Sequence, residues 1–149
     1  MFTGALLVVA VAGQSLGPPA SASRANSVAD VLEVLVRVVA AENCASKVCY
    51  VTVDGVAPSV RLLDRLTHFP HVQGMPKTGL PAGERQGARI IDLGPVHFAS
   101  ATRAGAGASV SDDWAGTGTF TTSDSCRYHF ERIADRWDLR QTETACMIF

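Results

Sequence analysis

The chain has 149 residues, and its 13 Lys and Arg nearly balance its 14 Asp and Glu, which gives a formal net charge of −1 at pH 7. This length is in the common range for one domain with a hydrophobic core of its own. Because the charges balance, no basic field is present to attract nucleic acid or acidic lipid, and we expect no nucleic-acid partner.

The first 22 residues carry no charged side chain and end in Ala20-Ser21-Ala22. An apolar run from Ala5 to Ala12 precedes a Gly- and Pro-rich stretch, and small residues occupy the −3 and −1 positions of a cut after Ala22. This layout is typical of a secretory signal peptide; an apolar N-terminal helix or strand of the folded domain is the alternative. The run has about half of the roughly 20 residues that a membrane-spanning helix requires, so we expect no membrane span. The sequence therefore predicts a signal peptide at 1–22 and one secreted or periplasmic domain at 23–149.

The first predicted element of that domain is a helix from Ser27 to Glu42. Its apolar residues recur at helical spacing, namely Val28, Val31, Leu32, Leu35, Val38 and Val39. Ser27 is placed to cap the start, with Asp30 three residues later. Because the polar side is thin, we expect this helix to lie across a sheet and to be largely covered.

All four cysteines, Cys44, Cys49, Cys126 and Cys146, follow the predicted leader. Four cysteines in an exported chain favour two disulfides, for which three connectivities are possible. Cys44 and Cys49 are five residues apart where the helix is expected to give way to a strand, so we expect a local bridge there and a second bridge from Cys126 to Cys146. A metal site or a redox dithiol is the alternative, but the chain has neither Cys-x-x-Cys nor a paired Cys/His spacing, and we predict no metal and no cofactor.

A strand and a short helix are predicted next. Val48 to Asp54 is rich in β-branched and aromatic residues and stops at Asp54-Gly55, which predicts a strand ending in a turn. Pro58-Ser59 then begins a short helix. The residues expected on its apolar face are Val60, Leu63 and Leu66.

The segment from His71 to Gly87 is punctuated by Pro and Gly and has little periodicity. It predicts a long loop, with at most a short strand around Val72, and such loops are often functional or mobile. His68 and His71 have a spacing that would let two imidazoles share a metal on a helix. Because Pro70 interrupts any helix there, we expect solvated loop histidines.

Antiparallel strands are predicted beyond this loop. Their ranges are Arg89 to Phe98 with a bulge or bend at Gly94-Pro95, Ala104 to Trp114, about Thr119 to Ile133, and Arg136 to Cys146. Ala134-Asp135 supplies a two-residue turn that pairs Phe130 with Leu139. The same register places Cys126 opposite Glu143, so the second disulfide requires a bulge or a different turn.

The order of elements is helix, strand, short helix and then four strands. Small residues from Ala104 to Ala108 imply a close approach by another element, most simply the long helix. We therefore expect an α+β domain in which one long N-terminal helix packs on a curved antiparallel sheet of four to five strands, plus one short helix.

Several segments occur in an order that resembles a known group of proteins. They are Tyr50-Val51-Thr52-Val53-Asp54-Gly55 with Pro58-Ser59 and Leu62-Leu63, Gly94-Pro95-Val96, and Tyr128-His129-Phe130 through Arg136-Trp137-Asp138-Leu139. The chain resembles, from about Tyr50 to Leu139, a loosely defined group of secreted bacterial proteins of uncharacterised function. Its layout is also similar to cystatin-like and nuclear-transport-factor-like α+β folds. The resemblance implies no activity, so it transfers no catalytic residue.

Two histidines are candidates for chemistry. His97 and His129 lie in predicted strands and could meet across the sheet, where one would act as a general base; ordinary half-exposed histidines are the alternative. Asp112 and Asp113 are neighbours in a strand and point to opposite faces, so we expect a solvated pair near a turn. No nucleophile-elbow or P-loop motif accompanies these residues, and we assign no catalytic residue.

Aromatic residues supply the other candidate surface. Any that the helix leaves uncovered would line a pocket on the concave side of the sheet, so the tentative surface or pocket residues are His97, His129, Trp114 and Tyr128. We expect a non-catalytic exported module that binds a protein or a small apolar ligand through the sheet or through the loop from His71 to Gly87. The alternative is a hydrolase- or isomerase-type enzyme with a histidine and a carboxylate in a sheet-lined cavity. An inhibitor of the cystatin kind is a third possibility, without a matching wedge motif.

Overall fold

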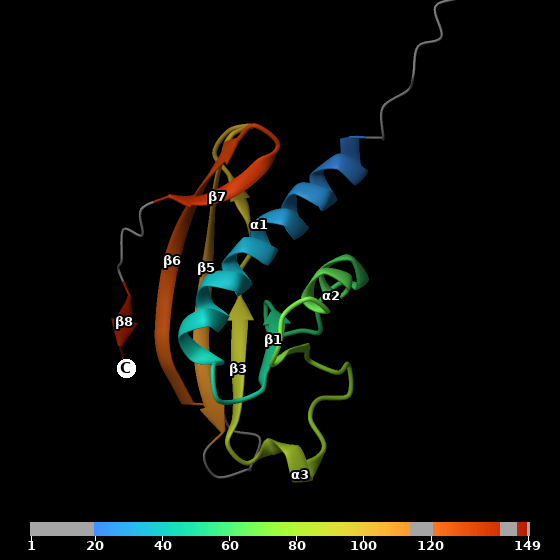
Figure 1. Ribbon diagram of the computed structural model, residues 1–149, viewed down its shortest axis with the longest axis vertical. Helices are drawn as coiled ribbons and strands as arrows, with labels where there is room; N and C mark the ends of the chain where they lie inside the picture. The colour runs from blue at the N-terminus through green and yellow to red at the C-terminus, as the bar shows by residue number, and fades with distance from the viewer. Residues whose placement is uncertain (1–19, 114–120, 141–145, 149) are drawn as a thin grey trace, which may run out of the picture.

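Figure 1 shows the computed structural model, which describes residues 20–113, 121–140 and 146–148. Positions 1–19 of the expected leader lie outside the described residues, as does the predicted pocket residue Trp114. Within the described ranges, none of the helices has the length and apolarity that crossing a membrane requires.

Helix α1 (Ala20–Asn43) lies across one face of the sheet (Figure 1). It starts before the expected cap Ser27, whose hydroxyl instead donates to the Ser23 carbonyl one turn earlier at 3.1 Å. Its buried side chains recur every three or four residues, as packing on a sheet requires, and include Val31, Leu32, Leu35, Val36 and Val39. The predicted Cys44–Cys49 disulfide is present and joins the end of α1 to strand β1 (Cys49–Val53).

The sheet follows the order β2-β1-β3-β5-β6-β7, with β4 paired to β5 and β8 paired to β6. Its other strands are β2 (Val72–Gly74), β3 (Ala88–Leu93), β4 (His97–Phe98), β5 (Arg103–Asp113), β6 (Thr121–Ile133), β7 (Arg136–Arg140) and β8 (Met147–Ile148). The α+β class is confirmed. The expected antiparallel sheet of four to five strands is wrong, because β1 runs parallel to both β2 and β3 and the sheet is larger and mixed.

Two crossover connections produce the parallel pairs. Helix α2 (Val60–Leu66) lies between β1 and β2, and the segment 75–87, which contains helix α3 (Ala82–Arg85), leads from β2 to β3. A parallel pair requires such a crossover, whereas a tight turn can only join antiparallel strands. The stretch expected to be a long loop therefore contains a short strand and a short helix.

Helix α2 begins where the sequence predicts. The Ser59 hydroxyl caps it by accepting a hydrogen bond from the Leu62 N–H at 3.4 Å. Its buried side chains are Leu62 and Leu66, whereas Val60 is 72% exposed. The expected apolar face was wrong at Val60, because the helix turns its first residue away from α1 and the sheet.

The expected strand from Arg89 to Phe98 is divided into β3 and β4 at Gly94-Pro95. The Gly94 N–H donates to the Gly107 carbonyl at 2.9 Å, but Pro95 has no N–H with which to continue the ladder. Both β3 and β4 pair with β5, so the interruption leaves two positions on β5, Ala106 and Gly107, where the neighbouring strand departs from regular pairing.

The β6–β7 hairpin has the predicted register, in which Phe130 pairs with Leu139, and the turn residue Ala134 has a left-handed φ of 55°. The predicted Cys126–Cys146 disulfide is also present. It forms because β8 pairs with β6 in a different register from β7, with Ser125 opposite Met147. The β6–β8 register differs from the β6–β7 register in the way that the bridge requires, because it brings Cys146 opposite Cys126.

Candidate functional site

The two faces of β5 differ in side-chain size and in what covers them. Ala104, Ala106 and Ala108 are buried on the face that α1 covers, whereas Gly105 and Gly107 alternate with them and lie on the opposite face. The predicted close approach of α1 therefore accounts for the small side chains of the three alanines, but not for the two glycines. On the opposite face, the two glycines leave a depression along β5.

The other half of this opposite face is covered by the segment 75–87. Leu80 and Met75 pack with Ala88 around Tyr50 of β1. The Tyr50 hydroxyl donates to a Glu84 carboxylate oxygen at 3.1 Å, and burial together with Glu84 raises the pKa of Tyr50. The segment 75–87 therefore covers this face of the sheet over β1, and the depression lies over β5 and β6.

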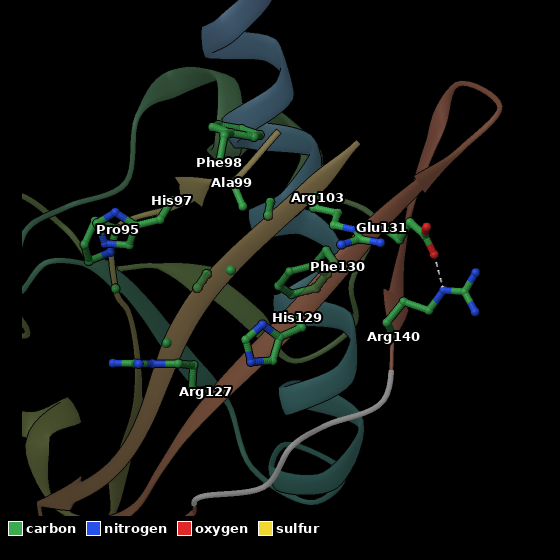
Figure 2. A pocket seen from close by; sticks show the side chains of 15 residues that line it. Pro95, His97, Phe98, Ala99, Arg103, Arg127, His129, Phe130, Glu131 and Arg140 are labelled. Atoms are coloured by element: carbon green, nitrogen blue, oxygen red, sulfur yellow. Dashed lines mark ion pairs between the residues drawn. The ribbon is translucent and has the colours of Figure 1, made fainter. Parts of the chain in front are cut away.

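This depression, which we call the sheet pocket, has a volume of about 1150 Å³. Ligand pockets commonly measure about 300–1000 Å³, so a ligand of drug size fits. Its lining comes from the β3–β4 connection, β4, β5, β6 and the end of β7 (Figure 2). The lining residues are Gly94, Pro95, His97, Phe98, Ala99, Arg103, Ala104, Gly105, Ala106, Gly107, Arg127, His129, Phe130, Glu131 and Arg140.

Strand register arranges the centre of the pocket in rows. His97 pairs with Gly105, Gly105 pairs with His129, and His129 pairs with Arg140, so these four residues form one row across four strands. Neighbouring strands are about 4.8 Å apart, which places the backbones of the two histidines about 10 Å from each other. Because the residue between them is glycine, no side chain separates the two imidazoles.

The glycines of the floor are not required by the backbone conformation. A Cβ built on Gly105 would meet the Tyr128 carbonyl oxygen at 3.7 Å and His129 Nδ1 at 3.8 Å, and one on Gly107 would meet the Cys126 carbonyl oxygen at 3.7 Å. These are ordinary van der Waals distances, and neither glycine is among those with positive φ. What glycine provides at both positions is therefore open space.

The charged side chains of the pocket are mostly cationic. Arg140 forms an ion pair with Glu131, the only acidic residue among the described residues that line the pocket. Within the described part of the chain, Arg103 and Arg127 have no hydrogen-bond or ion-pair partner for their guanidinium groups. Figure 2 shows Arg127 extending across β5 to the side of that strand on which Pro95 lies, whereas Arg103 lies near the end of the pocket that holds the Glu131–Arg140 pair. As far as the described residues show, two positive charges of the pocket therefore have no counter-charge.

The predicted histidines both line this pocket, from strands on opposite sides of β5 (Figure 2). Both are exposed, and among the described residues neither imidazole has a hydrogen bond or an ion pair. A general base of the usual kind is oriented by a hydrogen bond to a carboxylate. Glu131 is engaged with Arg140, so the structure brings a carboxylate and two histidines to one pocket without joining them.

Tyr128 lies on the other side of the sheet from the pocket. It pairs with Ala106 on the face that α1 covers and is 7% exposed, so it belongs to the core. His68 and His71 are exposed in the connection after α2, as expected of solvated loop histidines. The described residues contain no group of three or more His, Cys, Asp or Glu side chains that could hold a metal ion.

Sequence reasoning missed the arginines and glycines of the pocket. The available signal was the alternation Arg127-His129-Glu131 on β6, which places three polar side chains on one face at a period of two. That face meets Gly105 and Gly107 only through the β5–β6 register, in which Gly107 pairs with Arg127.

A second cluster of charge lies at the opposite end of β5, where the expected solvated pair Asp112-Asp113 is buried. Asp112 is 2% exposed and Asp113 is fully buried, so that expectation was wrong. Asp112 accepts hydrogen bonds from Arg89 Nε at 2.9 Å and Nη2 at 2.8 Å, with Lys47 Nζ 3.8 Å away. These hydrogen bonds from Arg89 hold the pKa of Asp112 below its ordinary value, although burial opposes them.

The Arg89–Asp112 pair also ties α1 to the sheet. Arg89 Nη1 donates to the Asn43 carbonyl, at the last residue of α1, at 2.9 Å. Asn43 precedes the Cys44–Cys49 bridge, and Cys49 pairs with Arg89 in the β1–β3 register. This cluster is therefore a structural support rather than part of the sheet pocket.

Comparison with protein-family models, with curated proteins and with solved structures finds no match to this chain.

Proposed function

We propose that this protein is a non-catalytic binding domain and that its ligand occupies the sheet pocket. The observation that carries the proposal is the glycine floor between His97 on one side and Arg127, His129 and Glu131 on the other, with Arg103 and Arg127 left without partners among the described residues. Exposed cations beside a depression of this volume are suited to holding a ligand, because neither charge is committed to stabilising the fold.

Binding has more support than catalysis. A hydrolase- or isomerase-type enzyme would need a carboxylate free to orient His97 or His129, and Glu131 is held by Arg140. Among the described residues, the lining also offers no serine, threonine or cysteine as a nucleophile. In the described lining, a hydrolase that works by acyl transfer would therefore lack both a free carboxylate to orient the histidine and a hydroxyl or thiol nucleophile.

We also propose that the domain is exported, with the leader at 1–22 removed. Two disulfides and no free cysteine among the described residues suit an oxidising compartment such as the periplasm or the extracellular space. The uncharged, apolar start of the sequence supports the same proposal.

The binding proposal is tested with N-phenyl-1-naphthylamine, a neutral apolar probe that fluoresces when it leaves water. Wild type is expected to take up the probe, and Gly105→Val and Gly107→Val are expected to lose it because their side chains fill the floor. Gly83→Val is the matched control, because Gly83 lies on α3, has open space around it and does not line the pocket. Equal uptake by wild type and by both floor variants would count against the pocket as the site.

A further inference from the structure

We propose, on the basis of the binding function above, that the ligand of the sheet pocket is an amphipathic organic anion: a carboxylate or phosphate group on an apolar body. The inference joins two properties of the same lining. Its charged groups are three arginines against one glutamate, and its remaining surface is formed by Gly, Ala, Pro and Phe residues together with the two histidines.

The net charge available to a ligand is that of the arginines that are not paired with a carboxylate. Glu131 neutralises Arg140, so the excess positive charge belongs to Arg103 and Arg127. An arginine binds a carboxylate or phosphate through two parallel N–H groups, and charge-assisted hydrogen bonds of this kind are stronger than neutral ones. A cationic ligand would meet two unpaired guanidinium groups and would be repelled.

The anionic group is placed at Arg127 rather than at Arg103. Arg103 pairs with Glu131 in the β5–β6 register, so an anion at that end would approach a carboxylate. Arg127 is four residues from Glu131 on the same strand, about 13 Å at roughly 3.3 Å per residue, and its neighbour on the same face is His129. The Arg127 end is therefore the end at which the positive charge has no carboxylate of the described lining beside it.

The direction of the Arg127 side chain indicates where the apolar body of the ligand lies. This side chain extends across β5 to the side of that strand on which Pro95 lies (Figure 2), over the position where Gly107 has no side chain. A ligand held by Arg127 can then lie over Gly107 and Gly105 and reach Pro95. An extended alkyl chain or an aromatic ring system fits this floor, since neither requires hydrogen-bond partners there.

The test compares four ligands that share a twelve-carbon chain: dodecanoate, dodecyl phosphate, dodecanol and dodecyltrimethylammonium. Each is titrated below its micelle-forming concentration into the oxidised protein, and binding is followed by calorimetry. The two anions are expected to bind about five- to tenfold more tightly than dodecanol, with the cation weakest. Which anion binds more tightly distinguishes a carboxylate ligand from a phosphate ligand.

Variants locate the anionic group. Arg127→Gln is expected to lower the affinity for the anions about five- to tenfold and to leave dodecanol unchanged, whereas Arg127→Lys keeps most of the affinity because it keeps the charge. Arg103→Gln is expected to have the smaller effect. Arg136→Gln is the control, because Arg136 is an exposed arginine of β7 outside the lining.

The outcomes separate the two proposals. If dodecanol and the cation bind as tightly as the anions and Arg127→Gln changes nothing, while Gly105→Val still prevents binding, the anion inference is wrong and the binding function stands. If neither N-phenyl-1-naphthylamine nor any of the four ligands binds to wild type, both proposals are wrong.

Discussion

His97 and His129 lie on opposite sides of Gly105, each paired with it from a neighbouring strand on the face of the sheet that α1 does not cover. The sequence suggested that these histidines could meet, and the register places them in one row. The residue between them is Gly105, which has no side chain, so the space between the two imidazoles is open. This space belongs to the sheet pocket, in which we propose that the ligand binds.

The first prediction concerns that glycine. Gly105→Val should weaken ligand binding while leaving the free energy of unfolding unchanged or raising it by up to about 1 kcal/mol, because valine suits a strand better than glycine. The distances of 3.7 and 3.8 Å around the added Cβ leave room for it. Urea unfolding measures the stability. A loss of several kcal/mol would mean that the glycine is needed for folding.

The second prediction concerns the buried Arg89–Asp112 pair. Asp112→Asn removes the charge that faces Arg89 and should lower the free energy of unfolding by about 2–4 kcal/mol, because the arginine loses the carboxylate that neutralises it in a largely buried place. Asp135→Asn is the control, since Asp135 is 99% exposed and its pair with Arg132 should contribute nothing measurable. Equal effects of the two substitutions would contradict this view of the cluster.

The same carboxyl group gives a third prediction, for pH. Arg89 lowers the pKa of Asp112 in the folded state from its ordinary value of 3.8, so the unfolded chain takes up this proton at a higher pH than the folded protein does. The stabilisation is therefore fully present above about pH 4 and is lost as the pH falls through the folded-state pKa. Urea unfolding between pH 7 and pH 2 should show a steeper acid loss in wild type than in Asp112→Asn. Parallel curves would contradict the prediction.

The fourth prediction concerns the Cys126–Cys146 bridge. Its 20-residue separation gives about 3 kcal/mol of stabilisation in the chain-entropy model, against about 2 kcal/mol for the five-residue separation of Cys44 and Cys49. The double substitution Cys126→Ala and Cys146→Ala should lower the free energy of unfolding by about the first amount. A change below about 1 kcal/mol would show that the bridge adds little to stability.

Export gives the fifth prediction. Protein from the native host should start at Ser23 and should contain no free thiol, because the leader is removed and both bridges form. Mass spectrometry before and after alkylation measures both properties. An intact Met1 with four alkylated cysteines would contradict export.

Local signals in the sequence were enough to predict several elements of secondary structure. The Asp54-Gly55 turn, the Ser59 cap and the Ala134-Asp135 turn each act within a few residues, and the strand, helix and hairpin beside them are in the structure as predicted. Cysteine spacing likewise gave both disulfides. These features depend on chemistry between near neighbours in the chain.

Features that depend on distant pairing were missed. Strand β2 has three residues, too few to show a periodic pattern, so the parallel pairing of β1 was not visible. The sheet pocket required knowing that Gly107 pairs with Arg127 and that the alanines, not the glycines, face α1. Burial of Asp112 likewise depends on Arg89, which reaches it from another strand.

The central claim is that ligand binds over the glycine floor, and backbone amide chemical shifts test it most directly. Titration of ¹⁵N-labelled oxidised protein with dodecanoate should move the amide signals of Gly94, Gly105, Gly107 and His129, which surround the floor. The signals of Val36 and Leu62, buried on the other side of the sheet, should stay in place. Shifts confined to α1 and α2, or no shifts at all, would contradict the claim.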